Sequence, residues 1–224
     1  MSYLVETHFH TSETSPCGQV RAADGIALYA SHGYDAVVVT DHFQAGWFER
    51  RMEMSWHARV EQWLAGYRLA GEAGARLGVK VYLGMEFTFP GTRDDVLVYG
   101  LAAARIMAHP DMHRLGPAGL ARLAREENLL LIQAHPYRSY ISMMYEDLVD
   151  GLEVHNGNPR HQSDNARAAM EAAKRNWVAL SGSDFHQVAD VARGGIRLPS
   201  LPEDTVALAS LLRQRKTSEL VTPA

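Results

Sequence analysis

Short apolar runs alternate along the chain with longer segments in which apolar residues recur at helical spacing. The runs are rich in Val, Ile and Leu, as expected of strands covered on both faces. They predict seven strands, over residues 3–10, 35–40, 79–87, 95–100, 128–135, 151–156 and 177–185. The segments between them predict helices over 22–33, 53–78, 116–128, 163–176 and 203–216. This alternation predicts an α/β fold with a largely parallel sheet, closed as one (β/α) barrel.

Composition limits the class of protein. The 224 residues are 46% hydrophobic and 21% charged, which fits one globular domain spanning residues 1–224. The net charge of −4 argues against a general nucleic-acid or membrane surface. The single cysteine, Cys17, excludes an intramolecular disulfide and fits a reducing compartment. No signal-peptide pattern and no apolar stretch of about 20 residues is visible, so a cytoplasmic location is expected.

The polar residues with metal-binding chemistry fall where the predicted strands end. In a barrel, the C-terminal ends of parallel strands converge on one face. The residues at these ends are His8, His10, Asp41, His42, Glu86, His135, Glu153, His155, Asp184 and His186. Imidazole and carboxylate together suit Zn, Mn or Fe, and one cysteine argues against a thiolate-rich structural zinc site. The pattern therefore predicts a metal centre, and two neighbouring ions can clamp a phosphoryl group.

Five motifs resemble those of a known family. "HFHTSE", "VVVTDH", "GMEF", "QAHPYR" and "SGSDFH" follow one another in this order. Together they resemble the motifs of the PHP (polymerase and histidinol phosphatase) family, and the resemblance extends from Tyr3 to about Arg197. It implies a distorted seven-stranded (β/α)7 TIM-like barrel with a centre of two or three metal ions that hydrolyses phosphoesters. Seven is also the number of strands predicted from the apolar runs.

The resemblance also implies a set of ligands for the first two ions. The first ion is expected on His8, His10, Glu86 and Asp184, and Glu86 is expected to bridge to a second ion on His135. Many family members supply a further His to the second ion just after the fourth strand. This chain has Leu101 and alanines there, so that ion is left with fewer protein ligands.

The third ion is expected on His42 and His186, with one more ligand from the loop after His10. Family members commonly carry His or Asp in this loop. Here "TSETSPCG" offers Glu13 or Cys17, and we expect Glu13. The alternative is that Glu13 is exposed, Cys17 is a packing residue, and the third ion is absent or held by two histidines and water.

Several further residues are candidates for the site. Arg138, His155 and Arg193 are expected to bind substrate, the two arginines through phosphate oxygens. A solvated surface position is the alternative for each arginine. Asp41, Glu153 and Asn156 are expected to orient ligands through hydrogen bonds. For Glu153 and Asn156, the alternatives are a substrate contact or a buried structural hydrogen bond.

These features favour a metal-dependent phosphoesterase that hydrolyses a small-molecule phosphate ester with metal-activated water. One alternative is an amidohydrolase-like metal-dependent hydrolase, and another is a non-catalytic metal-binding regulatory module. The TDH and SDxH motifs, and the lack of a metal-ligating lysine pattern, favour the phosphoesterase. No nucleic-acid or membrane partner is expected. The substrate, the native metal and the oligomeric state are left open by the sequence.

Overall fold

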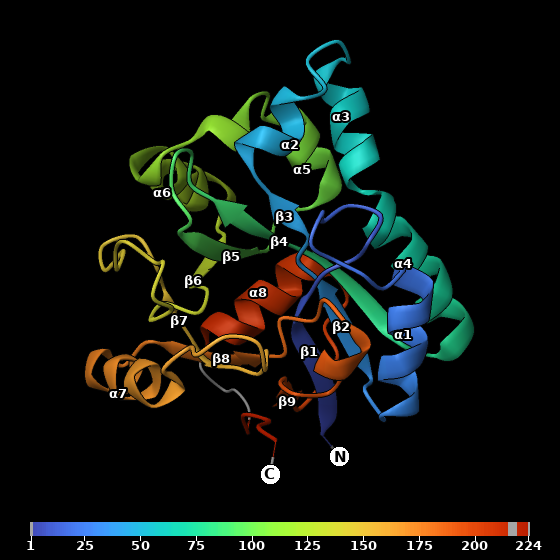
Figure 1. Ribbon diagram of the computed structural model, residues 1–224, viewed down its shortest axis with the longest axis vertical. Helices are drawn as coiled ribbons and strands as arrows, with labels where there is room; N and C mark the ends of the chain where they lie inside the picture. The colour runs from blue at the N-terminus through green and yellow to red at the C-terminus, as the bar shows by residue number, and fades with distance from the viewer. Residues whose placement is uncertain (1, 215–218, 224) are drawn as a thin grey trace.

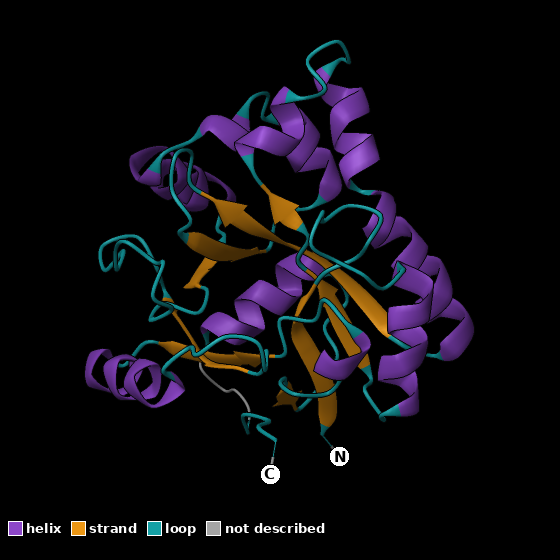
Figure 2. Ribbon diagram, viewed as in Figure 1, coloured by secondary structure: helices purple, strands orange, loops and turns teal. Residues whose placement is uncertain are grey.

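The predicted alternation of strands and helices is present in a computed structural model that describes residues 2–214 and 219–223. Figures 1 and 2 show a curved sheet with most of the helices on its outside. The strands are β1 (Tyr3–Phe9), β2 (Ala36–Val39), β3 (His42–Phe43), β4 (Lys80–Thr88), β5 (Asp95–Tyr99), β6 (Leu130–Gln133), β7 (Gly151–Asn156), β8 (Val178–Gly182) and β9 (Ile196–Leu198).

The α-helices are α1 (Ala22–Ser31), α2 (Ala45–Glu49), α3 (Trp56–Trp63), α4 (Ala65–Leu77), α5 (Ala103–Ala108), α6 (Pro117–Glu127), α7 (Asn165–Arg175) and α8 (Thr205–Arg213). Two short 3-10 helices, η1 (Met112–Arg114) and η2 (Val188–Asp190), lie in connections. The short helices α2 and α5 were not predicted. The predicted C-terminal helix is present as α8, and residues 215 and 216 of that prediction lie outside the described residues.

The sheet forms a nearly closed barrel. Its strand order is β8-β7-β6-β5-β4-β2-β1-β9, and β3 pairs with β4. Backbone hydrogen bonds between His8, His10 and Phe185 connect the end of β1 to the segment after β8, at 3.1 Å each. The expected α/β, TIM-like barrel is thereby confirmed. All seven predicted strands are present, and the described residues add the two short strands β3 and β9.

One of the seven predicted strands departs from the expected parallel arrangement, and the additional short strand β9 also pairs antiparallel, with β1. β5 runs antiparallel to both β4 and β6, whereas β1, β2, β4 and β3 pair in parallel, as do β6, β7 and β8. The first residue of β5, Asp95, therefore lies at the same end of the barrel as the last residues of its neighbours. This reversal changes which residues of β5 face the site.

The barrel interior is apolar at the end opposite the metal-binding motifs. Inward side chains of β1, β2, β5, β6 and β8 pack with Leu208, Ala209 and Leu212 of α8 in one buried cluster. Figure 1 shows α8 lying across the strands inside the curve of the sheet. Helices α1 and α4 cover the outside of β1 and β2 with a second apolar cluster. Because apolar side chains fill this end, the polar residues gather at the other.

The helix predicted over residues 53–78 is two helices. α3 ends at Trp63, α4 begins at Ala65, and Leu64 lies between them. At this break, the Thr14 hydroxyl donates to the carbonyl oxygen of Trp63 at 3.0 Å and accepts the Gly66 amide at 3.2 Å. These bonds replace helix hydrogen bonds, so the loop after β1 is anchored to the α3–α4 corner.

No helix among the described residues is long and apolar enough to cross a bilayer.

A buried histidine far from the metal-binding motifs gives the fold a testable pH dependence. The ring of His113 is fully buried and stacks on Phe48 and Trp56, with centroid distances of 5.0 and 5.6 Å. Neither of its ring nitrogens has a hydrogen-bond partner in the described structure. Burial, and then the nearby Arg114 and Arg59, lower the pKa of His113 despite Asp111 and Glu49.

We expect this residue to weaken the fold in mild acid. Below the ordinary His pKa of about 6.5, the unfolded chain binds a proton that folded His113 refuses. Stability should therefore fall with pH below that value, by up to about 1.4 kcal/mol per pH unit. His113→Leu should remove this component, measured as the difference from wild type in urea unfolding between pH 5 and 8. Exposed His57→Leu is the control, and an unchanged pH dependence in His113→Leu contradicts the prediction.

Candidate metal centre

Seven of the expected ligands come together at one end of the barrel. They follow or end separate strands: His8 and His10 at β1, His42 on β3, Glu86 on β4, His135 after β6, and Asp184 and His186 after β8. Strand register explains the closest approaches, because His42 is paired directly with Glu86 across β3 and β4. The convergence expected from the strand ends is therefore present in the fold.

Glu86 lies at the centre of the cluster. Its Oε1 is 3.1 Å from His135 Nε2 and 3.3 Å from His8 Nε2. Its Oε2 is 2.8 Å from His42 Nδ1 and 3.4 Å from His10 Nε2. The carboxylate is buried and has four imidazoles around it, so each of its oxygens can serve a different ion.

A second carboxylate lies opposite. Asp184 Oδ1 is 3.5 Å from the Nε2 atoms of both His8 and His10, and these two nitrogens are 3.1 Å apart. The three residues form one potential metal-binding group of buried side chains. This is the geometry expected when two imidazoles and a carboxylate share one cation.

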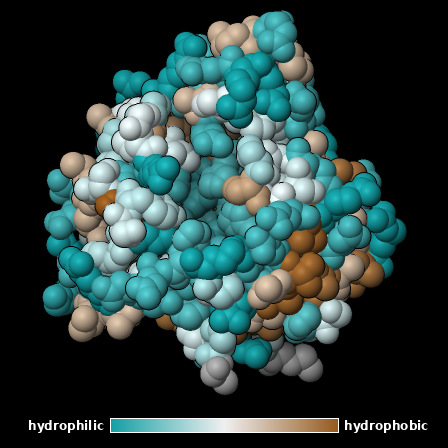
Figure 3. All heavy atoms as spheres, viewed as in Figure 1, coloured by the Kyte–Doolittle hydropathy of each residue, from teal (hydrophilic) through white to brown (hydrophobic). Residues whose placement is uncertain are grey.

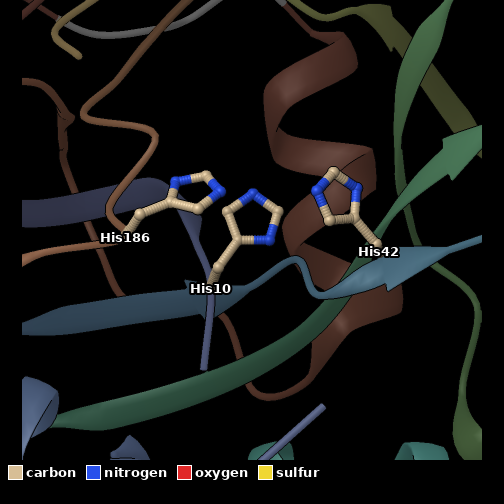
Figure 4. A group of neighbouring side chains, drawn as sticks. All are labelled: His10, His42 and His186. Carbon is tan, nitrogen blue, oxygen red and sulfur yellow. The ribbon is translucent and has the colours of Figure 1, made fainter. Parts of the chain in front are cut away.

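Three histidines form a neighbouring group. Figure 4 shows the rings of His10, His42 and His186 side by side, with His10 in the middle. The ring centroids of His10 and His186 are 4.3 Å apart, and those of His10 and His42 are 4.6 Å apart. Cys17 Sγ lies 3.1 Å from His186 Nε2, at the open side of this group.

Hydrogen bonds hold the ligand rings by their other nitrogens. His8 Nδ1 is 2.8 Å from Glu153 Oε1, His10 Nδ1 is 3.1 Å from Ser15 Oγ, and His186 Nδ1 is 2.8 Å from the Asp184 carbonyl oxygen. A ring held at Nδ1 presents Nε2 to the centre of the cluster. Glu153 also accepts the backbone amide of His135 at 2.9 Å. Glu153 therefore contacts both the ring of His8 and the backbone of His135, and its role in orienting metal ligands stays a prediction.

Asp41 and Asn156 hold loops and side chains beside the cluster. Asp41 accepts from the Thr11 amide and from the Ser15 hydroxyl, each at 2.7 Å, so it positions the loop after β1. Asn156 Oδ1 accepts from Arg138 Nη2 at 2.7 Å, and Asn156 Nδ2 donates to Glu153. Asp41 is not among the potential metal-binding groups of the described chain.

Backbone strain and close packing mark two strand ends. His135 and Asp184 have φ values of 30° and 52°, in the left-handed region that non-glycine residues adopt at a cost of about 1–2 kcal/mol. Gly182 lies two positions before Asp184 in the sequence. A Cβ there would lie 2.5 Å from His8 Cβ and 3.0 Å from Glu153 Oε1. Glycine in "SGSDFH" therefore allows β8 to approach the ligands of β1.

Neighbouring groups in the cluster shift one another's pKa values in opposite directions. Burial lowers the pKa of His8, but the carboxylates of Glu153, Asp184 and Glu86 raise it well above its usual range. Burial and the adjacent His186 and His42 lower the pKa of His10 well below its usual range. Burial raises the pKa of Glu86, but His42 and His8 lower it strongly. Neighbouring imidazoles that cannot all carry protons are well suited to share cations instead.

The donor set fits divalent metal ions. His135 Nδ1 is buried without a hydrogen-bond partner in the part of the chain that is described, and so is His42 Nδ1 despite its proximity to Glu86. Imidazole nitrogens and carboxylate oxygens are ligands that Zn, Mn and Fe accept. A cation beside Glu86 would give the buried His42 Nδ1 the partner that it otherwise lacks.

Asp95 is a site residue that the sequence interpretation missed. It is buried, forms a potential metal-binding group with His42 and Glu86, and its Oδ2 is 3.9 Å from His135 Nε2. Burial and the charge of Glu86 raise its pKa to about 6. The sequence does place Asp95 at the start of the apolar run "DVLVYG". That end of the strand reaches the site only because β5 runs antiparallel to its neighbours. Leu101, after the other end of β5, is buried in an apolar cluster.

Glu13 does not join the cluster. Its carboxylate accepts the backbone amide of Ala22 at 2.9 Å and lies 3.8 Å from Arg21 Nε. It therefore caps the start of α1, where the N-cap residue makes no side-chain hydrogen bond of its own. The expectation of Glu13 as the loop ligand is corrected by this position, because Cys17 is the loop residue beside His186. Partial burial raises the pKa of Cys17, but hydrogen bonding with His186 and His42 lowers it to about 7.

The expected substrate residues separate into two groups. Arg138 is buried beside the cluster and donates from Nη2 to Asp184 Oδ2 at 2.7 Å. Arg193 instead donates from Nε to the Gly157 carbonyl oxygen at 2.9 Å, and His155 Nε2 lies 3.1 Å from the Arg193 carbonyl oxygen. Neither Arg193 nor His155 lines the cavity over the cluster among the described residues. These contacts hold both side chains against backbone carbonyl groups away from the cavity, and Arg193 is half-buried, so it does not take the solvated surface position that was its alternative.

A polar cavity opens directly over the cluster of histidines and carboxylates. It has a volume of about 460 Å³ and is lined by ligand residues together with Cys17, Asp95, Arg138, Tyr140, Asn158, Arg160 and His161. A second cavity of about 830 Å³ adjoins it and shares four of these residues. Figure 3 shows a hollow near the middle of this face, surrounded by hydrophilic residues. Tyr140, Asn158, Arg160 and His161 were not predicted because they lie on loops, where no strand-end pattern applies.

Comparison with known proteins places the chain in a family. A family model described as the PHP domain matches residues 6–213. No curated protein matches the chain in a sequence search. Similar folds are found among solved structures, at identities that show the fold alone.

One similar structure is a two-domain protein from Bacteroides vulgatus ATCC 8482, described as containing a predicted PHP-like metal-dependent phosphoesterase. It has a TM-score of 0.70 and 15% identity over 97% of this chain, which spans only 64% of that protein. PsfC from Pseudomonas syringae PB-5123 has a TM-score of 0.69 and 17% identity, covering 100% of this chain and 92% of that protein. An amidohydrolase from Chromobacterium violaceum, with bound sulfate and no metal, has a TM-score of 0.60 and 16% identity, with 98% of each chain covered.

Proposed function

The chain belongs to the PHP domain family, and from this membership we propose that it is a metal-dependent phosphoesterase that hydrolyses a small-molecule phosphate ester. One observation carries the proposal: the Glu86 carboxylate is surrounded by His8, His10, His42 and His135 at the floor of a polar cavity. That arrangement supports a multinuclear centre, and the arginine beside it supports an anionic substrate. Residues 1–224 are proposed to form a single domain, supported by the match across 6–213.

We assign the ligands in three groups. The first ion is held by His8, His10, Glu86 and Asp184. The second is held by Glu86 and His135, and Asp95 takes the place of the missing histidine. The third is held by His42 and His186, and Cys17 replaces Glu13 as the ligand from the loop. The supporting observations are the distances from Glu86 and Asp184, the burial of Asp95 and the 3.1 Å approach of Cys17 to His186.

Two or three divalent ions (Zn, Mn or Fe), when bound, supply the Lewis acidity that activates water and offsets phosphoryl charge. The chain's own residues orient the reaction. Glu153 and Ser15 hold the rings of His8 and His10 in the direction of the centre. Arg138 is held by Ser163, Tyr140, Asn156 and Asp184, and only one N–H of Nη1 is left for a phosphoryl oxygen. Its proposed substrate contact is therefore a single hydrogen bond to a phosphate oxygen.

Among the described residues that line the cavity over the ligands, none is a lysine. This agrees with the motif pattern in favouring phosphoesters over the amide and ester substrates of an amidohydrolase. The test is an assay of phosphomonoesters, phosphodiesters and acyl esters with Mn, Zn or Fe and after chelation. Metal-dependent turnover of a phosphoester is expected. Turnover of acyl esters alone indicates the amidohydrolase, and metal binding without any turnover indicates a regulatory module.

The assignment of Cys17 makes a separate prediction about metal content. Cys17→Ser is expected to lose about one ion per chain, because an alcohol is a much poorer ligand than a thiolate for soft or borderline cations. Glu13→Gln is the matched control in the same loop and is expected to retain the full complement. Elemental analysis after gentle purification measures both. Metal loss confined to Glu13→Gln restores Glu13 as the ligand, and loss in neither variant removes this loop from the metal centre.

A further inference from the structure

Four residues form a wall between the two cavities. Arg138, Tyr140, Arg160 and His161 line both the 460 Å³ cavity over the ligands and the adjoining 830 Å³ cavity. The outer cavity is otherwise lined by Tyr137, Ser139, Gln162 and Asp164. If the phosphoryl group lies over the metal ligands, the rest of the substrate extends past this wall. The scissile ester oxygen then lies beside these four side chains.

Three members of the wall are poor proton donors. Arg138 is held by four hydrogen bonds, and Arg160 forms a two-point ion pair with the buried carboxylate of Asp190. Guanidinium groups do not release a proton near neutral pH. Tyr140 accepts a hydrogen bond from Arg138 Nη1 at 3.0 Å, and burial raises the pKa of its hydroxyl. None of the three is suited to protonate a leaving group.

His161 differs from its neighbours on the wall. Its ring is exposed to the cavities and makes no side-chain hydrogen bond within the described residues, so both nitrogens are free to meet a substrate. The ring meets the edge of Tyr140, with centroids 6.3 Å apart and planes at 82°. It belongs to the loop after β7 and lies outside the potential metal-binding groups of the described chain.

We propose that His161 is the general acid that protonates the ester oxygen of the leaving group, within the phosphoesterase function proposed above. A water oxygen forms the new bond to phosphorus, and the water gives up one proton to solvent. The bond from phosphorus to the ester oxygen breaks, and its electron pair stays on that oxygen. The oxygen takes the proton from the His161 ring and leaves as an alcohol. Neutral His161 then regains a proton from solvent, so atoms and charge balance.

The charges around His161 are compatible with this role. Burial and the nearby Arg138 lower its pKa in the free protein, although Asp184 opposes this effect. A phosphate dianion bound over the metal ligands adds negative charge at the wall. Phosphoryl oxygens that face the ring favour its protonated form, which opposes the effects of burial and Arg138.

Two substrates with different leaving groups test the assignment. A p-nitrophenolate ion leaves without a proton, whereas the alkoxide from glycerol phosphate needs one. His161→Ala and His161→Gln are expected to lower kcat/KM for glycerol phosphate by about 10²- to 10⁴-fold. Both variants should retain kcat/KM for p-nitrophenyl phosphate within about tenfold, since general acid catalysis contributes little to that substrate. His57→Ala, an exposed histidine on α3 that lines neither cavity, is the matched control.

Each outcome has a defined meaning. Equal losses on both substrates, no loss on either, or rescue by His161→Gln overturns the proposal, because glutamine keeps a hydrogen bond but cannot deliver a proton. If wild-type protein loaded with Mn, Zn or Fe hydrolyses no phosphomonoester or phosphodiester of the panel described above, the phosphoesterase function itself is overturned, and the role of His161 with it. Circular dichroism confirms that each variant is folded before its kinetics are compared.

Discussion

Replacing Glu86 by alanine is expected to abolish turnover and to remove at least one metal ion per chain. This carboxylate is buried and touches His8, His10, His42 and His135, so its loss affects more than one ion. The loss of activity should exceed the roughly 10- to 100-fold effects seen when a group that only orients a ligand is removed. Elemental analysis and phosphoester kinetics measure the two effects on the same preparation.

The matched control for this experiment is Glu72→Ala, which removes an exposed carboxylate on α4. It should leave metal content and turnover unchanged. Circular dichroism shows whether Glu86→Ala has folded. A folded Glu86→Ala protein that keeps its metal ions and hydrolyses phosphoesters near the wild-type rate contradicts the placement of Glu86 at the centre of the site.

Asp184 is expected to matter to both stability and activity, and two substitutions separate these effects. Its Oδ2 accepts from buried Arg138 at 2.7 Å, while its Oδ1 faces His8 and His10. Asp184→Ala leaves the Arg138 charge without its carboxylate partner, at a cost of about 3–5 kcal/mol in the free energy of unfolding. Asp184→Asn keeps an acceptor for Arg138 and tolerates the φ of 52° better than alanine, so it should lose less stability.

Both Asp184 variants should lose turnover, because neither alanine nor an amide replaces a carboxylate as a ligand for these cations. Urea unfolding measures stability, and phosphoester kinetics measure activity. Adding Arg138→Met to Asp184→Ala should restore part of the lost stability without restoring turnover, since the unpaired charge is then gone. Equal stability of Asp184→Ala and wild type contradicts the structural role, and turnover in folded Asp184→Asn contradicts the proposed ligand role.

The local pattern of apolar and polar residues was sufficient to predict the strands of the barrel. The seven apolar runs each became a strand, and the last residues of the parallel strands carry most of the cluster. This succeeded because a buried strand needs a continuous apolar run and because parallel strands end on one face, two constraints that act within a few residues. The prediction of one helix over 53–78 was wrong for the opposite reason. Its break at Leu64 depends on Thr14, a residue about 50 positions away.

The direction of β5 and the paths of the loops decided the remaining parts of the candidate site. An apolar run has the same pattern in either direction, so the sequence could not show that Asp95 lies at the site end and Leu101 in the core. The sequence also could not show whether Glu13 or Cys17 is the loop residue that lies beside the cluster. Both lie in one short loop, and the structure separates them because Glu13 meets the amide of Ala22 while Cys17 meets His186.

The sequence by itself determined the family, the barrel, and the histidine and carboxylate residues that end its strands. Only the tertiary structure decided that Asp95 joins them from the reversed strand β5, and that the loop residues Cys17 and His161 lie at the cavity over the cluster. The physical reason is that strand-end residues are positioned by backbone hydrogen bonding that repeats along the chain. Loop residues are positioned by individual contacts with distant partners, such as Cys17 with His186, and such contacts leave no periodic signal in the sequence.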